Sequence, residues 1–467
     1  MIPSRSTVLK DDTTADTTDD RTTVPRRARR MSAVAAAGAL LAAAMTAPAA
    51  ATPVTAPSAA PATAPATPSA TPSATTSAAS GSPLDHGALR QSLDAVHEAG
   101  MYGIYSAVRD GVHGWKGASG VADVRTRRPV RPDMRHRVGS ITKTFTAVAV
   151  LQQVERGAVE LDAPVNRYLP GLLPGARGDK VTVRMLLNHT SHIADYIAGA
   201  FPSLVQGSAA SLDEHRFRTL RPRELAELGL AAPPTGEPGA TPGSYSNTNY
   251  IIAGMLLEKV TGTPAERHIT RHVIDRAGLR HTSFPRTPRI SGPHSKAYES
   301  MYGLIDPPRD YSVYDMSWGG TAGALVSTMD DLNRFYRALL RGRLLGPAQL
   351  AEMQQTVPVG VGGFAIDYGL GLYALDLPCG RFWGHDGGVW GMGTQSLASA
   401  DGGRQLSFGF NLMKYQRVDE DGRLEPHPAD AAMGNHLLAG LCGPGAARTA
   451  QAPVTPLPAD RMLSIKR

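Results

Sequence analysis

The chain has 467 residues, 42% of them hydrophobic, and a formal net charge of +7. This length allows one large domain or two ordinary ones, and the hydrophobic content excludes a wholly disordered chain. Basic residues do not cluster with interleaved aromatic residues, which excludes nucleic acid as a partner, and the charge excess favours only mild attraction to anionic polymers.

The composition of the first 83 residues predicts an export signal followed by a spacer, rather than a folded domain. Residues 1–51 have the pattern of an export signal, with a basic stretch at 26–30, an apolar stretch at 33–45 and small residues at 47–51. The apolar stretch is too short to span a bilayer comfortably. Residues 52–83 consist almost wholly of Ala, Pro, Thr and Ser, which is typical of an extended spacer. We therefore expect a secreted protein, with cell-wall association as an option, that does not span the membrane when mature.

Residues 84–446 predict the folded domain. It begins with an amphipathic helix at 88–97 and a hairpin with strands at 103–109 and 112–121. A second hairpin, with strands at 393–398 and 405–412, closes it around the turn Asp401-Gly402-Gly403. Strands at both ends with helices between them predict an α/β (α+β) fold, an antiparallel sheet flanked by helices. A mostly helical lobe is expected at about 181–289, with the ligand site between lobe and sheet.

The first chemical motif is Gly139-Ser140-Ile141-Thr142-Lys143, at the start of an apolar helix. Residues three apart lie on one face of a helix, so the Lys143 amine can reach the Ser140 hydroxyl. A serine hydroxyl is a weak nucleophile until a neighbouring base takes its proton. Alone, the pattern fits better a serine that caps a helix beside a solvated lysine, because serine is a preferred N-cap.

Two further motifs follow in order. A Tyr-x-Asn motif, Tyr245 and Asn247, precedes an apolar helix, and a His-x-Gly motif, His385 and Gly387, lies between two strand-like segments. Each has a structural alternative, a capped turn for the first and a glycine-rich hairpin for the second. Three such motifs in this order are much less probable by chance than one.

The two cysteines are Cys379 and Cys442. An exported protein with two cysteines commonly pairs them, and two buried free thiols are the alternative. Residues 447–467 contain several prolines and predict a disordered tail. His189 and His192 form a His-x-x-His pattern, but no carboxylate stands at a suitable spacing, so no metal or other cofactor is expected.

With these motifs in this order, the chain resembles the serine β-lactamase and penicillin-binding protein superfamily. It is most similar to class C β-lactamases, secreted D-alanyl-D-alanine carboxypeptidases and related esterases. Further landmarks support the resemblance: the stretches at 161–164, 186–191, 317–318 and 368–371. The resemblance implies a β-lactamase/transpeptidase-like fold, and a disulfide between Cys379 and Cys442 as in the secreted carboxypeptidases.

The resemblance also implies a serine hydrolase that works through an acyl-enzyme on Ser140. The implied catalytic residues are Ser140, Lys143, Tyr245, Asn247 and His385. The backbone N–H groups of Ser140 and Gly388 would form the oxyanion hole, and substrate would contact Trp318, Tyr373, Asp386 and Gly387. Lys143 and Tyr245 would share the proton transfers, Asn247 would hold the substrate amide or Lys143, and His385 would donate to the substrate or to Tyr245.

The substrate is predicted less narrowly than the chemistry. The secreted carboxypeptidases have His-Thr-Gly-Thr as third motif and an arginine on the preceding strand, whereas this chain has His385-Asp386-Gly387-Gly388 and Tyr373 near the arginine position. Asp386 would repel a terminal carboxylate, face away or bind an ammonium.

The first hypothesis is therefore a D-alanyl-D-alanine carboxypeptidase acting on peptidoglycan stem peptides. An esterase, amidase, β-lactamase or D-amino-acid peptidase is the second, and a penicillin-binding sensor without turnover the third. β-Lactams are expected to acylate the enzyme, and a monomer is expected.

Overall fold

The computed structural model describes residues 84–361, 364–419 and 424–449. The expected export signal (1–51), the spacer (52–83) and the segment 450–467 of the expected tail lie outside the described residues. All described residues belong to one compact unit, Thr75–Arg467. Within them, no helix is long and apolar enough to cross a membrane.

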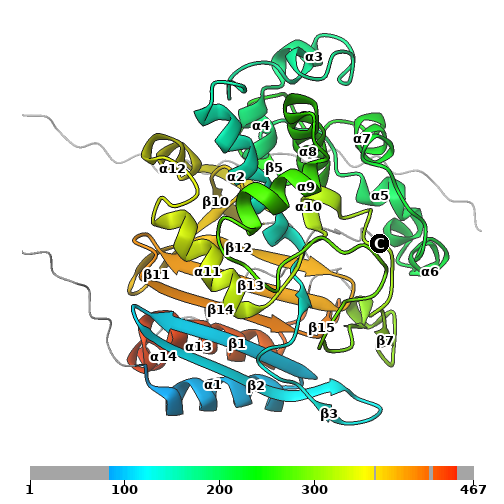
Figure 1. Ribbon diagram of the computed structural model, residues 1–467. Coiled ribbons are helices and arrows are strands. Elements are labelled where there is room, and N and C mark those ends of the chain that lie inside the picture. Colours follow the sequence, from blue (N-terminus) through cyan, green and yellow to red (C-terminus); the bar gives the residue numbers. More distant parts are fainter. Residues whose placement is uncertain (1–83, 362–363, 420–423, 450–467) are drawn as a thin grey trace, which may run out of the picture. The chain divides into compact units, whose positions relative to one another are not determined.

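The central element of the described residues is a sheet of ten strands (Figure 1). Their order is β3-β2-β1-β14-β13-β12-β11-β10-β9-β5. The strands are β1 (Gly103–Asp110), β2 (His113–Asp123), β3 (Arg128–Pro129), β5 (Gly243–Ser244), β9 (Val357–Val361), β10 (Phe364–Tyr368), β11 (Tyr373–Leu377), β12 (Gly380–Val389), β13 (Met392–Ser399) and β14 (Arg404–Phe410).

The pairing of β1 with β14 joins the two ends of the fold, as the sequence predicts. These strands are antiparallel, with Ile104 opposite Phe410. The other neighbours in the sheet are also antiparallel, except that β5 pairs with β9 in parallel, which the sequence analysis did not foresee. Two small sheets complete the strands: β4 (His136–Arg137) with β8 (Val326–Ser327), and β15 (Leu412–Met413) with β6 (Tyr298–Glu299) and β7 (Arg309–Asp310).

Two terminal helices cover one face of the sheet: α1 (His86–Glu98) and α13 (Pro428–Cys442) (Figure 1). Their apolar side chains form one core with the inward residues of β14, which include Leu406 and Phe408. The expected disulfide between Cys379 and Cys442 is present and ties the β11–β12 turn to the end of α13. A short helix, α14 (Pro444–Thr449), follows α13 and includes the first three residues of the expected tail.

The other face of the sheet packs against α2 (Thr142–Glu155) and α11 (Met329–Leu340). Phe145 of α2 stacks on Phe335 of α11 with 3.7 Å between ring centroids. In α2 the residues from Thr142 to Gln153 are all buried, which is the pattern of a helix in the middle of a core rather than on a surface. The Ser-x-x-Lys motif therefore lies at the start of a helix that the core encloses.

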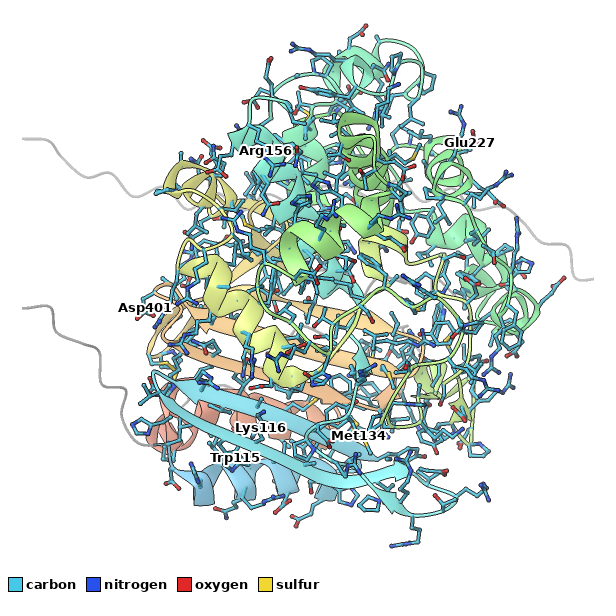
Figure 2. The ribbon with its side chains drawn as sticks, viewed as in Figure 1. Trp115, Lys116, Met134, Arg156, Glu227 and Asp401 are labelled. Atoms are coloured by element: carbon cyan, nitrogen blue, oxygen red, sulfur yellow. A yellow bond between two sulfur atoms is a disulfide. The ribbon has the colours of Figure 1, made fainter. Side chains whose placement is uncertain are left out.

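The side chains of β2 alternate between the two faces (Figure 2). Trp115 is buried and packs beside His436 of α13, with 6.1 Å between ring centroids. The next residue, Lys116, makes an ion pair of 3.0 Å with Asp330 of α11 on the opposite side. This alternation is what a period of two residues requires of a strand between two layers.

Most of the remaining helices lie in the segment 160–290, which holds the predicted helical lobe. They are α3 (Arg177–Lys180), α4 (Val183–Leu187), α5 (Ile197–Ala200), α6 (Ala210–Glu214), α7 (Pro222–Ala231), α8 (Asn247–Thr261) and α9 (Ala265–Ile269), with short helical turns at Val165–Arg167, Pro202–Gln206 and Thr270–Ile274. Later in the chain come the turn Met301–Gly303 and the helices α10 (Gly320–Gly323) and α12 (Pro347–Met353). β5 interrupts the helical segment and joins the main sheet directly before α8.

Candidate active site

Ser140 lies in a single 3-10 turn, Gly139–Ile141, that leads into α2. It is 3% exposed, and the helix start has no side-chain cap, so the capping alternative does not apply. Gly139 has a φ of +54°, and a Cβ there would lie 2.6 Å from the backbone nitrogen of Gly388. The glycine thus lets strand β12 pass directly beside the nucleophile.

Lys143 is fully buried one turn after Ser140. Its Nζ lies 2.9 Å from Ser140 Oγ, 2.7 Å from Asn247 Oδ1 and 2.9 Å from the carbonyl oxygen of Ala322. Burial lowers the pKa of Lys143 to about 7, because desolvation outweighs the opposing negative charges of Asp195 and Asp386. A neutral amine would donate its two N–H groups to the carbonyl oxygens of Asn247 and Ala322 and turn its lone pair to Ser140.

Asn247 is oriented by Asp195, a residue that the sequence analysis did not identify. Asp195 Oδ2 accepts hydrogen bonds from the Asn247 backbone nitrogen at 2.9 Å and from Asn247 Nδ2 at 2.7 Å. Since Nδ2 is committed to the carboxylate, Oδ1 must face Lys143. Of the two roles predicted for Asn247, the structure therefore shows the one in which it holds Lys143. Asp195 and Asn247 are separated by 52 positions in the sequence, which leaves no local signal by which the pair could have been found.

Tyr245 lies over the Lys143 amine, which is 5.0 Å from the centre of its ring. Burial raises the pKa of the Tyr245 phenol well above 10, although its contact with Ser140 acts in the opposite direction. The sequence analysis gave Tyr245 a share of the proton transfers, but a phenol with an ordinary pKa near 10 acts as a base at neutral pH only if nearby positive charge lowers that pKa. Burial has the opposite effect, so Lys143 is the better base and Tyr245 stays a neutral phenol beside Ser140.

His189 supports Tyr245 from behind and was not foreseen in this role. The two ring centroids are 4.1 Å apart, and His189 is completely buried. Its Nδ1 accepts from the backbone nitrogen of Ser246 at 3.2 Å and lies 3.1 Å from Asn249 Nδ2, so the ring holds the turn of the Tyr-x-Asn motif in place. Burial lowers the pKa of His189 well below 6.5, and the nearby Lys143 charge acts in the same direction. The described residues contain no group of metal ligands that includes it.

His385 and Asp386 occupy neighbouring positions on β12. His385 is 1% exposed, with Nε2 2.9 Å from the Tyr368 hydroxyl and Nδ1 2.5 Å from the backbone oxygen of Asp386. A hydrogen bond from His385 to Tyr245 is not what the structure shows, because their ring centroids are 6.3 Å apart and the imidazole is engaged elsewhere. Asp386 faces the site closely enough for its charge to act on both Lys143 and Tyr245.

The two glycines after Asp386 bring β12 against the nucleophile. A Cβ on Gly387 would lie 1.9 Å from the carbonyl oxygen of Val138 and 3.0 Å from the Ser140 nitrogen. The glycine is therefore required by the neighbouring chain, whereas the sequence analysis placed it in contact with substrate. The backbone nitrogens of Ser140 and Gly388 both lie where β12 meets the 3-10 turn, and their role as the oxyanion hole stays a prediction.

Of the other predicted substrate contacts, Trp318 lies in an aromatic cluster and Tyr373 behind His385. Trp318 is half-buried, and its ring lies 5.8 Å from Phe201 and 5.6 Å from Trp390 between centroids. Tyr373 is 1% exposed and its hydroxyl accepts from Gln395 Nε2 at 2.7 Å, while its ring is 5.6 Å from that of His385. Contact of either residue with substrate stays a prediction.

This geometry agrees with the comparisons to known proteins. The β-lactamase family model matches residues 88–425. The chain belongs to the β-lactamase family. With Ser140 and Lys143 hydrogen-bonded to each other at the start of α2, it is a serine hydrolase of the β-lactamase and penicillin-binding protein superfamily, as the sequence predicted. The mixed fold, with its antiparallel sheet, is that of the family as well.

Several relatives of this chain have names that state an activity. The solved D-stereospecific amidohydrolase from Streptomyces sp. is 38% identical, with a TM-score of 0.66, over 77% of this chain and 99% of that one. Penicillin-binding protein 4* of Bacillus subtilis is 27% identical over 69% of this chain and 68% of its own length. A D-aminopeptidase of Cereibacter sphaeroides is 28% identical over 68% of this chain, and the match spans 58% of that protein.

Proposed function

We propose that this enzyme hydrolyses amides and esters of D-amino acids that carry a free amino group, through an acyl-enzyme on Ser140. The observation that carries the proposal is the charge around the nucleophile. Asp195 and Asp386 both act electrostatically on the Lys143 amine, and both raise its pKa. A substrate ammonium would be attracted to the same two carboxylates, whereas a substrate carboxylate would be repelled.

The relatives support the D-amino-acid specificity. The amidohydrolase from Streptomyces is aligned over 99% of its length and is described as D-stereospecific, and a second relative is described as a D-aminopeptidase. The third motif supports it as well, since His385-Asp386-Gly387-Gly388 has a carboxylate where the secreted carboxypeptidases have a hydroxyl.

The proton transfers follow from the contacts of Lys143. As Ser140 Oγ bonds to the substrate carbonyl carbon, its proton passes to the neutral Lys143 amine 2.9 Å away. The N–H groups of Ser140 and Gly388 stabilise the oxyanion, and the Lys143 ammonium returns the proton to the leaving amine or alkoxide as its bond to carbon breaks. Water then attacks the ester carbon, gives a proton to Lys143, and releases the acid as Ser140 regains its proton.

A D-alanyl-D-alanine carboxypeptidase of peptidoglycan stem peptides is the second candidate. The resemblance of the three motifs and the similarity to penicillin-binding protein 4* favour it. Secretion is proposed for either activity, supported by the pattern of residues 1–51 and by the disulfide between Cys379 and Cys442. β-Lactams are proposed as acylating ligands in both cases.

The test is a substrate panel with the purified enzyme: D-alanine p-nitroanilide, its L-enantiomer, its N-acetyl derivative, and an N-acylated peptide ending in D-Ala-D-Ala. We expect the free D-aminoacyl anilide to have the highest kcat/KM. Its advantage over the N-acetyl form should be roughly tenfold or more, the contribution of one charge-assisted hydrogen bond. Ser140→Ala is the inactive control.

Asp386→Asn sharpens the panel because it removes one of the two carboxylates. It should reduce the preference for the free amine and leave a neutral p-nitrophenyl ester nearly unaffected. A wild-type enzyme that hydrolyses the acylated D-Ala-D-Ala peptide faster than the free D-aminoacyl anilide would contradict the proposal and establish the carboxypeptidase.

A further inference from the structure

A buried ion pair lies behind the aromatic cluster and is not part of the chemistry described so far. Glu299 of β6 is completely buried and Lys414, which follows β15, is 4% exposed. Glu299 Oε2 and Lys414 Nζ are 3.1 Å apart. Removing two charges from water is costly, and such a pair is often no more stable than apolar residues of the same size. Stability is therefore a weak reason for its presence.

The carboxylate of Glu299 holds the turn between β12 and β13. In this hairpin Val389 pairs with Met392, so Trp390 and Gly391 form the turn. Glu299 Oε2 accepts from the Gly391 backbone nitrogen at 3.1 Å. Gly391 has a φ of +75°, and a Cβ there would lie 2.3 Å from the carbonyl carbon of Ala297, so the turn is closely packed against the segment that carries Glu299.

The ammonium of Lys414 holds the side chain of the same turn. Its Nζ lies 4.7 Å from the centre of the Trp390 ring, within the range of a cation–π contact. Trp390 is 3% exposed, and its ring lies 5.7 Å from Phe201 and 5.6 Å from Trp318 between centroids. The pair thus contacts the turn at two points. Glu299 accepts a hydrogen bond from the backbone of Gly391, and Lys414 lies over the ring of Trp390.

The turn is close to the nucleophile in the chain and in space. Gly388, the predicted oxyanion donor, is two residues before Trp390, and its backbone nitrogen adjoins Gly139. We propose that Glu299 and Lys414 are positioning residues that fix the β12–β13 turn, and through it the Gly388 donor and the aromatic wall formed by Trp390. The inference rests on the acyl-enzyme chemistry of the proposed function, but not on the D-aminoacyl substrate.

The test measures acylation of Ser140 without any particular substrate. A neutral fluorophosphonate bonds to Ser140 Oγ through phosphorus and loses fluoride, while the serine proton passes to Lys143. The test variant Glu299→Gln/Lys414→Met removes both charges, keeps similar side-chain volumes and leaves the net charge unchanged. The matched control is Asp110→Asn/Arg404→Met, which removes a part-buried ion pair of 3.2 Å between β1 and β14. The labelling end-point counts folded sites, so the rate constant refers to folded enzyme only.

We expect labelling of the test variant to be slower by about tenfold or more, because small displacements of catalytic groups have effects of this size. The control should label at the wild-type rate. The proposal is overturned if the test variant labels within about twofold of wild type, or if the control is slowed as much as the test variant.

These outcomes are separate from those of the proposed function. A wild-type enzyme that labels rapidly but prefers no D-aminoacyl substrate would contradict the proposed function and leave the expected rate difference intact. A D-aminoacyl hydrolase whose labelling rate is insensitive to the loss of Glu299 and Lys414 would contradict only the inference.

Discussion

The two sides of the catalytic centre are built differently. On one side, Lys143 and Asn247 at the starts of α2 and α8, together with Asp195, form a series of side-chain hydrogen bonds that begins at the hydroxyl of Ser140. On the other side, β12 contributes mainly backbone, and His385 is occupied by Tyr368. The comparison indicates that proton transfer belongs to the helical side, whereas the strand side supplies shape, charge and the predicted oxyanion donor Gly388.

The largest expected effect on turnover comes from substituting Ser140 or Lys143 on the helical side. Ser140→Ala should lower kcat by about 10⁶-fold, and Lys143→Met by nearly as much. The two residues act as a unit, so removing either one abolishes the function of both. Turnover of a p-nitrophenyl ester and covalent labelling measure both variants. Ser119→Ala on β2 is the matched control and should behave as wild type, and labelling that persists in Ser140→Ala would refute the assignment of the nucleophile.

A smaller effect is expected on the strand side. His385→Gln should lower kcat by less than the roughly 10²-fold that direct proton transfer contributes, since the imidazole is hydrogen-bonded within the sheet. Tyr368→Phe removes only the hydroxyl that meets His385 Nε2 at 2.9 Å and should produce a similar loss. If His385→Gln proves as damaging as Lys143→Met, proton transfer is shared by the two sides and the comparison fails.

The pH dependence tests the electrostatic link between the sides. The base form of Lys143 is neutral, so kcat/KM should rise with pH through an apparent pKa near 7. Asp195 and Asp386 raise this pKa, Asp195 more strongly, so removing either charge should move the rise to lower pH. We expect the displacement for Asp195→Asn to exceed that for Asp386→Asn. A rise that does not move in either variant would assign the titration to another group.

The smallest effect on turnover is expected from removing the disulfide, which joins the β11–β12 turn to the end of α13. Cys379→Ser/Cys442→Ser opens a cross-link with a sequence separation of 63. In the chain-entropy model this lowers the free energy of unfolding by about 4 kcal/mol. Denaturant unfolding measures the loss, while kcat at 25 °C should be nearly that of wild type. A large fall in kcat of the folded double variant would show that the disulfide positions β12.

The sequence by itself determined the chemistry of the helical side and the outline of the fold. Ser140 and Lys143 are three residues apart, in the 3-10 turn and the first turn of α2, so local geometry alone brings them together. The terminal hairpins, α1, and the pairing of the cysteines were also predicted, because alternating strands, turn residues and a pair of cysteines are local or compositional signals.

The tertiary structure alone decided which residues orient the catalytic groups. Asp195 reaches Asn247 across 52 residues, and Glu299 reaches Lys414 across 115. It also decided the pKa of Lys143, the protonation of Tyr245 and the orientation of His385. The physical reason is the same in each case. Desolvation and long-range hydrogen bonds depend on the groups that surround a residue after folding, and these groups cannot be identified from the spacing of residues along the chain.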